Sequence, residues 1–389
     1  MIKRVPHGYP RIMGMKLTGH LRFLVACLFG IAAPLFAATA SAEDISLSEL
    51  GNTLQIDETG ISLSGVSSGA FMAQQFHVAH SGNVTGVGIV AGGPYDCASG
   101  SYFWSPFDFT GLYAALHVCS ATGAFGVFNG PPDVSYSVDA TREAGEAGTI
   151  DDPAHLETDR VWLFSGANDD RIPREVLESV EAYYAAFLSP DSIAFETHPA
   201  ANHAMITDDF GNSCEADGTP YINDCDFDAA KALLQHIHGP APLAPKAPES
   251  EVSATTAFDQ TEFFDQDDKS VSMHALGHIH VPESCAAGAS CRLHVAFHGC
   301  QQSQDVIGDA FYRGAGYNEV AESNNIIVLY PQATAWSESF FFGYRENPRG
   351  CWDWWGYSGD DFSRRAGKQI QAVARMINAL TGKQLLPLD

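Results

Sequence analysis

A serine between two glycines is the residue in this sequence best placed to act as a nucleophile. Gly65-Val66-Ser67-Ser68-Gly69 fits G-x-S-x-G, a sharp turn from a strand into a helix that exposes a serine hydroxyl. Residues 60–64 suit a short strand, and residues 70–79 place apolar side chains along one helical stripe. The glycines suit a turn in which a side chain would crowd the strand–helix contact. Ser67 is therefore predicted to be a catalytic nucleophile.

Two further residues follow predicted strands in the order that such a serine requires. A catalytic serine needs a base, and the base needs a carboxylate that orients it. Asp169 follows the apolar strand predicted at residues 161–164, and His203 follows the next strand, at residues 192–197. Asp170 and His198 are the alternatives, although His198 stands at the strand end itself and before a proline. We predict a triad of Ser67, Asp169 and His203.

An oxyanion hole needs two backbone N–H groups aimed at the developing negative charge. One normally belongs to the residue after the nucleophile, here Ser68. The other belongs to a loop after a strand that ends in His-Gly, and Phe297-His298-Gly299-Cys300 provides such a loop. The predicted donors are therefore the N–H groups of Ser68 and Cys300.

The order of these segments along the chain is unusual. In an ordinary α/β-hydrolase the His-Gly loop precedes the serine, whereas here it follows by more than 200 residues. Residues 239–248 contain four prolines in ten residues, which favours an extended linker. Moving residues 250–389 ahead of residue 43 restores the usual order. We predict a circularly permuted, single-domain α/β-hydrolase fold over residues 43–389, with residues 239–250 as the bridge between former termini.

The remaining elements follow from hydrophobic periodicity and from breaker residues. Further strands are expected at residues 61–63, 87–91, 277–281, 293–299 and 325–330, and helices at residues 227–236 and 361–380.

The first 42 residues are typical of an export signal. A basic region precedes an apolar run, and Ala40-Ser41-Ala42 fits a cleavage site. Eight cysteines lie beyond the signal, and an even number in an exported chain favours disulfides. Cys214 with Cys225 and Cys285 with Cys291 are plausible local pairs, but spacing alone leaves the connectivity open. The protein is expected to be secreted.

Charge excludes some partners. The signal holds five of the 21 basic residues and none of the 47 acidic ones, so the rest of the chain has 16 minus 47, or −31. Such a charge repels nucleic acid and anionic membranes. No cysteine pair has zinc-site spacing, and the histidine pairs His236/His238 and His278/His280 have no evident third ligand. No metal and no cofactor are expected.

Three segments resemble a known family. Residues 65–73 (Gly-Val-Ser-Ser-Gly-Ala-Phe-Met-Ala), 297–303 (Phe-His-Gly-Cys-Gln-Gln-Ser) and 324–332 (Asn-Asn-Ile-Ile-Val-Leu-Tyr-Pro-Gln) are similar to those of polyhydroxybutyrate depolymerases and related esterases. The permuted order resembles the single-domain fungal type. The resemblance implies the same fold and the same five site residues. It also implies hydrolysis of poly(3-hydroxybutyrate) or similar short-chain polyhydroxyalkanoates, as polymer or soluble oligomer. Unlike many bacterial extracellular members, this chain is expected to have no appended substrate-binding domain, and we expect a monomer.

Two other functions remain open at this point. A feruloyl or acetylxylan esterase would share the core motifs, and a non-catalytic polymer-binding protein could use the same scaffold. The complete set of Ser67, Asp169 and His203 argues against the second.

Residues 347–357 match the Cys-Trp-rich loop of the family. Flat apolar side chains suit an uncharged aliphatic polyester, so Trp352, Trp354 and Trp355 are predicted to bind substrate, although three tryptophans in four residues cannot all face one cleft. A Cys300–Cys351 disulfide is favoured, because it would tie this loop to the oxyanion loop.

Overall fold

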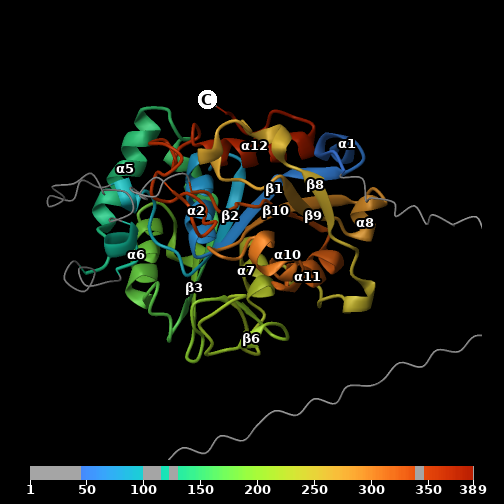
Figure 1. The fold of residues 1–389 in the computed structure, drawn as a ribbon, viewed down its shortest axis with the longest axis horizontal. Helices are drawn as coiled ribbons and strands as arrows, with labels where there is room; N and C mark the ends of the chain where they lie inside the picture. Colours follow the sequence, from blue (N-terminus) through green and yellow to red (C-terminus); the bar gives the residue numbers. More distant parts are fainter. Residues whose placement is uncertain (1–44, 100–114, 122–129, 338–345, 389) are drawn as a thin grey trace, which may run out of the picture. The chain divides into compact units, whose positions relative to one another are not determined.

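The structure is a computed structural model that describes residues 45–99, 115–121, 130–337 and 346–388 (Figure 1). These residues belong to one compact unit, Asp44–Asp389. The predicted signal, residues 1–42, lies outside the described residues. Within the described ranges, no helix is both long enough and apolar enough to span a bilayer.

An eight-stranded sheet forms the centre of this unit, with the strand order β4-β3-β2-β1-β10-β11-β9-β8. Strand β9 runs antiparallel to both of its neighbours, and the other pairings are parallel. The strands are β1 (Gln55–Val66), β2 (Val84–Val90), β3 (Arg160–Gly166), β4 (Ile193–His198), β8 (Thr256–Asp259), β9 (Leu276–His280), β10 (Ser290–Phe297) and β11 (Ile326–Tyr330). A small second sheet holds β5 (Met205–Thr207), β6 (Asn212–Ser213) and β7 (Ile222–Asp224).

Helices cover both faces of the sheet because its central strands are buried on both sides. Phe297 of β10 packs against Phe76 of helix α2 (Ser68–Ala79) on one face. Side chains alternate along a strand, so Ser64 of β1 points to the other face, where its hydroxyl lies 2.7 Å from that of Tyr317 in α11 (Tyr317–Asn324). Helices α6 (Arg174–Tyr184) and α12 (Lys368–Thr381) join α2, and α7 (Ala229–Ile237) joins α11. The other α-helices are α1 (Leu47–Gly51), α5 (Val134–Glu146), α8 (Glu283–Ala286), α9 (Gln304–Ile307) and α10 (Ala310–Gly314).

The strand order agrees with a permuted connection. When β8–β11 are placed before β1, the strand that ends in His298-Gly299 is the third and the strand that ends at the serine is the fifth, which restores the usual order of these motifs. Residues 240–250 are largely exposed and connect α7 to β8. The unpermuted order would instead join the segment after α12 to the segment before α1. These two helices pack together: a Cβ on Gly51 would lie 2.4 Å from the carbonyl oxygen of Leu380.

Most predicted elements are present, but the final helix begins later than predicted, and strand β8 was missed. The final helix begins at Lys368 and not at residue 361, because residues 361–367 form a tight turn. A Cβ on Gly367 would lie 2.7 Å from the carbonyl oxygen of Asp361. Strand β8 was not predicted, because it has four residues at the sheet edge and buries fully only Phe258.

The connection through residues 239–250 can be tested by restoring the unpermuted order. A chain that starts at Glu249, runs to Asp389 and continues through a short flexible linker into Glu43–Gly239 keeps every strand neighbour. It should fold with a stability within about 1–2 kcal/mol of the parent chain, because loop-closure entropy depends weakly on length. Circular dichroism and urea unfolding measure this. Aggregation at every linker length would contradict the prediction, and a control opened inside β10, after Val295, should not fold.

Two buried histidines and one half-buried histidine should make stability depend on pH. Burial lowers the pKa of His80, His238 and His298 to about 4 each, whereas an unfolded histidine has a pKa of about 6.5. Between those values the unfolded chain binds more protons than the folded one, so the free energy of unfolding falls as the pH falls. We expect the free energy of unfolding to fall by about 1 kcal/mol for each pH unit and for each of the three histidines.

Urea unfolding at pH 7.5, 6.5 and 5.5 measures this slope. Replacing the exposed His155 by Gln should leave the slope unchanged. A stability that is constant or rises toward pH 5.5 would show that these histidines are protonated in the folded state.

Candidate active site

Ser67 lies at the sharp turn between β1 and α2. Its backbone has φ 56° and ψ −123°, a conformation that few non-glycine residues adopt. The two glycines of the motif permit this turn. A Cβ on Gly65 would lie 2.1 Å from the carbonyl oxygen of Gly69, and a Cβ on Gly69 would lie 2.3 Å from that of Phe297. The chain therefore turns in direct contact with the end of β10.

His203 and Asp169 are brought together at the ends of neighbouring strands. His203 Nδ1 lies 2.9 Å from Asp169 Oδ2, and both side chains are buried. The other carboxylate oxygen, Oδ1, accepts hydrogen bonds from the backbone N–H groups of Arg171 and Ile172, each at 2.9 Å. These bonds hold the carboxylate in place, so that His203 Nδ1–H donates to it and Nε2 is left free to accept a proton.

Ser67 and His203 border one cavity of about 320 Å³. The alternatives for the acid and the base do not form this pair. Asp170 borders the cavity, but its side chain is exposed and has no hydrogen bond to His203. His198 Nδ1 accepts from the N–H of Ala200 and lies 3.5 Å from the sulfur of Cys214. The geometry therefore pairs His203 with Asp169.

The His-Gly loop lies against the serine. A Cβ on Gly299 would be 3.2 Å from Ser67 Cβ. The fully buried His298 donates from Nδ1 to the carbonyl of Gly299 (2.8 Å) and accepts at Nε2 from the N–H of Ala333 (3.1 Å). The N–H of Gly299 donates to Gln302 Oε1, 2.7 Å away.

Two N–H groups beside the serine remain available. Among the described residues, the N–H groups of Ser68 and Cys300 have no hydrogen-bond acceptor. Their neighbour Gln301 donates its N–H to the carbonyl of Arg349, at 2.8 Å. Free donors at this edge of the cavity are what an oxyanion hole requires.

Two curated proteins are similar to this chain over most of its length. A poly(3-hydroxybutyrate) depolymerase of Delftia acidovorans is 38% identical over 332 residues, 84% of this chain but only 61% of the relative. A polyhydroxybutyrate depolymerase of Talaromyces funiculosus is 31% identical over 369 residues, 92% of this chain and 96% of the relative. The chain belongs to the polyhydroxybutyrate depolymerase family. The resemblance drawn from the three motifs is thereby confirmed.

Solved structures of depolymerases have the same fold. The crystal structure of a PHB depolymerase from Penicillium funiculosum aligns with a TM-score of 0.73 and 29% identity, over 85% of this chain and 98% of that one. A PHB depolymerase with a serine-to-alanine substitution, complexed with an R3HB trimer, aligns with the same TM-score over the same shares at 30% identity. The predicted α/β-hydrolase fold is confirmed. No protein-family model matches the sequence.

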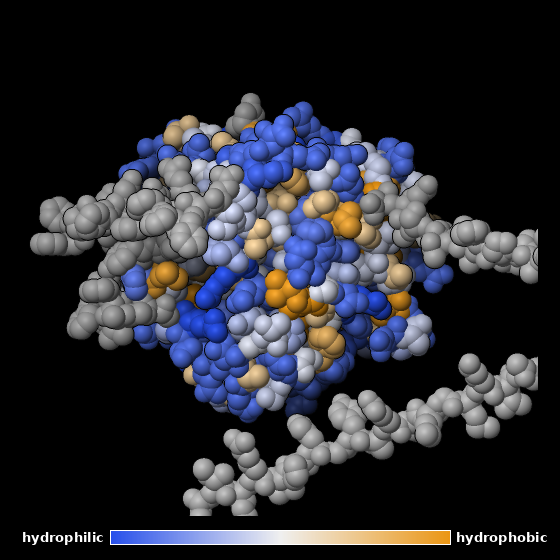
Figure 2. Space-filling model, in the orientation of Figure 1, coloured by the Kyte–Doolittle hydropathy of each residue, from blue (hydrophilic) through white to orange (hydrophobic). Residues whose placement is uncertain are grey.

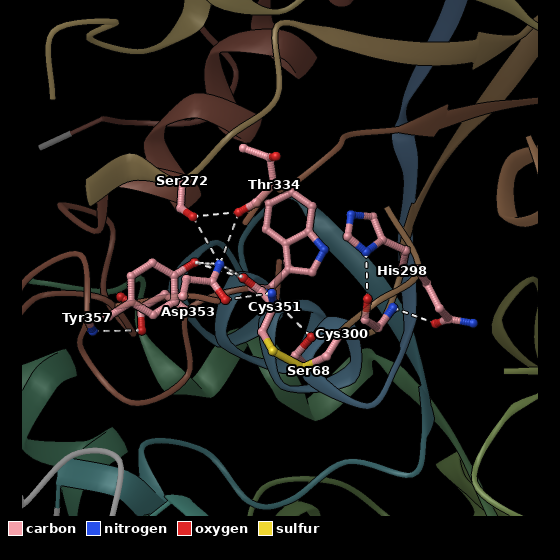
Figure 3. The surroundings of a disulfide bond; sticks show 12 residues. Ser68, Ser272, His298, Cys300, Thr334, Cys351, Asp353 and Tyr357 are labelled. Carbon is pink, nitrogen blue, oxygen red and sulfur yellow. Dashed lines mark hydrogen bonds between the residues drawn. A yellow bond between two sulfur atoms is a disulfide. The ribbon is translucent and has the colours of Figure 1, made fainter. Parts of the chain in front are cut away.

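In this depolymerase-family chain a disulfide joins the His-Gly loop (residues 297–300) to the tryptophan loop (residues 347–357) (Figure 3). Cys300 is bonded to Cys351 with their Cα atoms 4.1 Å apart, as predicted. The next residue, Trp352, donates its N–H to the hydroxyl of Ser68 at 3.2 Å. The tryptophan loop is thus attached to Cys300 through the disulfide and to Ser68 through this hydrogen bond.

The other six cysteines form the remaining disulfides of the described chain. The predicted pairs Cys214–Cys225 and Cys285–Cys291 are confirmed, and the third is Cys97–Cys119. His198, Cys214 and Cys225 also lie close enough together to hold a metal ion. The two sulfurs are bonded to each other, so neither is a thiolate ligand.

The three tryptophans have different surroundings. Trp354 borders the cavity and stacks on Phe71 with ring centroids 4.1 Å apart. Trp352 is fully buried and lies edge-on to Phe297, and Trp355 lies edge-on to Trp354 away from the cavity wall. The structure therefore places only Trp354 where a substrate would touch it. Trp352 and Trp355 pack inside the protein and do not border the cavity.

Sequence reasoning missed several residues of the cavity wall. Phe71 lies one helical turn after Ser67, so its place in the sequence could have predicted that it borders the cavity. Arg171 and Tyr221 come from separate loops, where Arg171 lies 5.3 Å from the Tyr221 ring. No local pattern marks such a contact.

Removing the Cys300–Cys351 disulfide should reduce both stability and turnover. The bond closes a loop of 51 residues, for which chain entropy predicts a loss of about 4 kcal/mol. A Cys300→Ser, Cys351→Ser variant should also hydrolyse a short p-nitrophenyl ester more slowly, because the Cys300 N–H is no longer held.

The matched control is Cys285→Ser, Cys291→Ser, which opens a loop of only 6 residues away from the cavity. It should lose about 2 kcal/mol and keep its turnover. Equal loss of turnover in both variants would mean that the Cys300–Cys351 bond has no specific effect on the site.

Proposed function

We propose that this chain is a secreted serine esterase that hydrolyses the ester bonds of poly(3-hydroxybutyrate) or of similar short-chain polyhydroxyalkanoates. The observation that carries this proposal is the cavity that Ser67 and His203 border, with Asp169 bound to His203 at 2.9 Å. The named relatives support the substrate class.

In the first half of the reaction, Ser67 Oγ attacks the ester carbonyl carbon while His203 Nε2 takes its proton. The carbonyl oxygen becomes an oxyanion, and the N–H groups of Ser68 and Cys300 stabilise it. Asp169 holds the imidazolium that has formed. His203 then gives the proton to the leaving alkoxide, which departs as a hydroxyl end, and the acyl group stays bonded to Ser67.

Water completes the cycle. His203 takes a proton from a water molecule, whose oxygen attacks the acyl carbon in the same oxyanion hole. The bond to Ser67 Oγ breaks and Ser67 regains its proton from His203. The product is a carboxylic acid, ionised at neutral pH. None of these steps needs a metal or an organic cofactor.

The cavity wall suits an uncharged aliphatic ester. Val66, Phe71, Leu116, Ile172 and Trp354 provide apolar surface beside the nucleophile. The face in Figure 2 is mostly hydrophilic, and its hydrophobic patches are small and separate. A related depolymerase is complexed with an R3HB trimer, which supports short oligomers as substrates.

The cellular setting is part of the proposal. Four disulfides fit an oxidising compartment, and the basic, then apolar N-terminus fits an export signal. The acidic charge disfavours nucleic acid and anionic membranes as partners. We propose that the enzyme acts as a monomer.

The nucleophile is tested by paired serine substitutions. Ser67→Ala should lower turnover of a short p-nitrophenyl ester at least roughly 10⁴-fold, because nothing else at the turn can form the acyl-enzyme. Ser68→Ala should keep most activity, since Ser68 contributes its backbone N–H. Its hydroxyl only accepts the bond from Trp352. An active Ser67→Ala enzyme with an inactive Ser68→Ala enzyme would place the nucleophile one residue later.

Substrate class is decided by product analysis. Wild-type enzyme is incubated with polyhydroxybutyrate and with feruloylated or acetylated xylan. Release of 3-hydroxybutyrate or its oligomers supports the proposal, whereas release of ferulate or acetate alone would favour the carbohydrate esterase. A protein that cleaves no ester at all would be a binding protein on a hydrolase scaffold.

A further inference from the structure

Arg349 places a positive charge at the wall of the catalytic cavity, outside every ion pair of the described residues. Most basic side chains in the described part of this acidic chain are ion-paired, but Arg349 forms no ion pair with any described residue. Its side chain is exposed and it borders the same cavity as Ser67 and Cys300. The charge is therefore available to a ligand that occupies the site.

The other arginine of the cavity is already neutralised. Arg171 donates from Nε and from one terminal nitrogen to the two oxygens of Asp217, at 3.0 and 2.9 Å. Asp170 also borders the cavity, with an exposed carboxylate. The net charge of the wall is thus close to zero. Any selectivity for an anion has to come from direct contact with Arg349, because the chain as a whole is strongly acidic and does not attract anions at long range.

The backbone of Arg349 is held firmly beside the oxyanion loop. Its carbonyl accepts the N–H of Gln301 at 2.8 Å. Two residues later, Cys351 is bonded to Cys300, and the side chain of Asn347 accepts the N–H of Cys351 at 2.8 Å. The base of the arginine side chain is therefore fixed relative to the loop that receives the substrate carbonyl.

Oligomers of a hydroxyalkanoate supply a matching anion. Each chain ends in a carboxylate, and in the last unit only two carbon atoms separate it from the oxygen of the final ester. A guanidinium group binds a carboxylate through paired hydrogen bonds, more specifically than a point charge would. Internal units of the polymer carry no charge, so they cannot make this contact.

We propose that Arg349 binds the terminal carboxylate of a hydroxyalkanoate oligomer and thereby directs cleavage to the ester bond nearest that end. The inference rests on the proposed function, because it assumes that such an ester occupies the cavity. Arg349 is a specificity-determining residue in this scheme. It takes no part in the chemical steps at Ser67.

The test compares an R3HB trimer as the free acid with its methyl ester, for wild type and for Arg349→Gln. Wild type should have the lower KM for the free acid. Arg349→Gln should raise that KM roughly 10-fold, as expected for loss of a hydrogen bond to a charged group. Its KM for the methyl ester should change less than twofold. Arg349→Lys should keep part of the preference, since it retains the charge.

The matched control is Arg142→Gln, which removes one exposed positive charge far from the cavity wall. It should change neither KM. The proposal is overturned if Arg349→Gln raises both KM values equally, or changes neither. Hydrolysis of the methyl ester by the variant shows that it has folded. If wild type cleaves neither trimer, the proposed function fails, and that result is distinct from an absent preference for the free acid.

Discussion

The contact between the serine turn and the end of β10 determines where the rest of the site can be. Gly69 lies so close to Phe297 that no side chain fits between them. This contact sets Ser67 directly beside His298-Gly299-Cys300, although more than 200 residues separate the two segments. Parallel pairing of β1 with β10 keeps them in register. Asp169 and His203, the proposed acid and base, follow the ends of β3 and β4, which lie beyond β2 on the other side of β1.

A second layer of polar contacts keeps the loops of the site rigid. Asp353 is fully buried, and its carboxylate accepts hydrogen bonds from the N–H groups of residues 355–358 and from the hydroxyl of Ser358. Burial raises the pKa of Asp353, while these donors oppose the shift. The tryptophan loop thus folds around this carboxylate, and the Cys300–Cys351 bond attaches the folded loop to the proposed oxyanion hole (Figure 3).

The parts of this molecule that local chemistry dictates could be predicted from sequence. The serine turn, the buried strands and the His-Gly loop each have a short pattern of residues, so both the fold and the candidate residues followed from them. Contacts made by packing could not be predicted. Trp352 and Trp354 look equivalent in sequence, yet one packs on Phe297 in the core and the other stacks on Phe71 at the cavity. Edge strand β8 was missed because pairing with β9, and not its own composition, makes it a strand.

The permuted connection has a consequence for how the chain folds as it emerges. Strand β1 comes early, but one of its two neighbours, β10, begins at Ser290. Until that late segment appears, β1 has an open edge along which it could join another chain. The central sheet therefore depends on contacts of very long sequence separation, which form slowly. Ser67 is therefore made long before Cys300, which lies on the segment that completes the surroundings of Ser67.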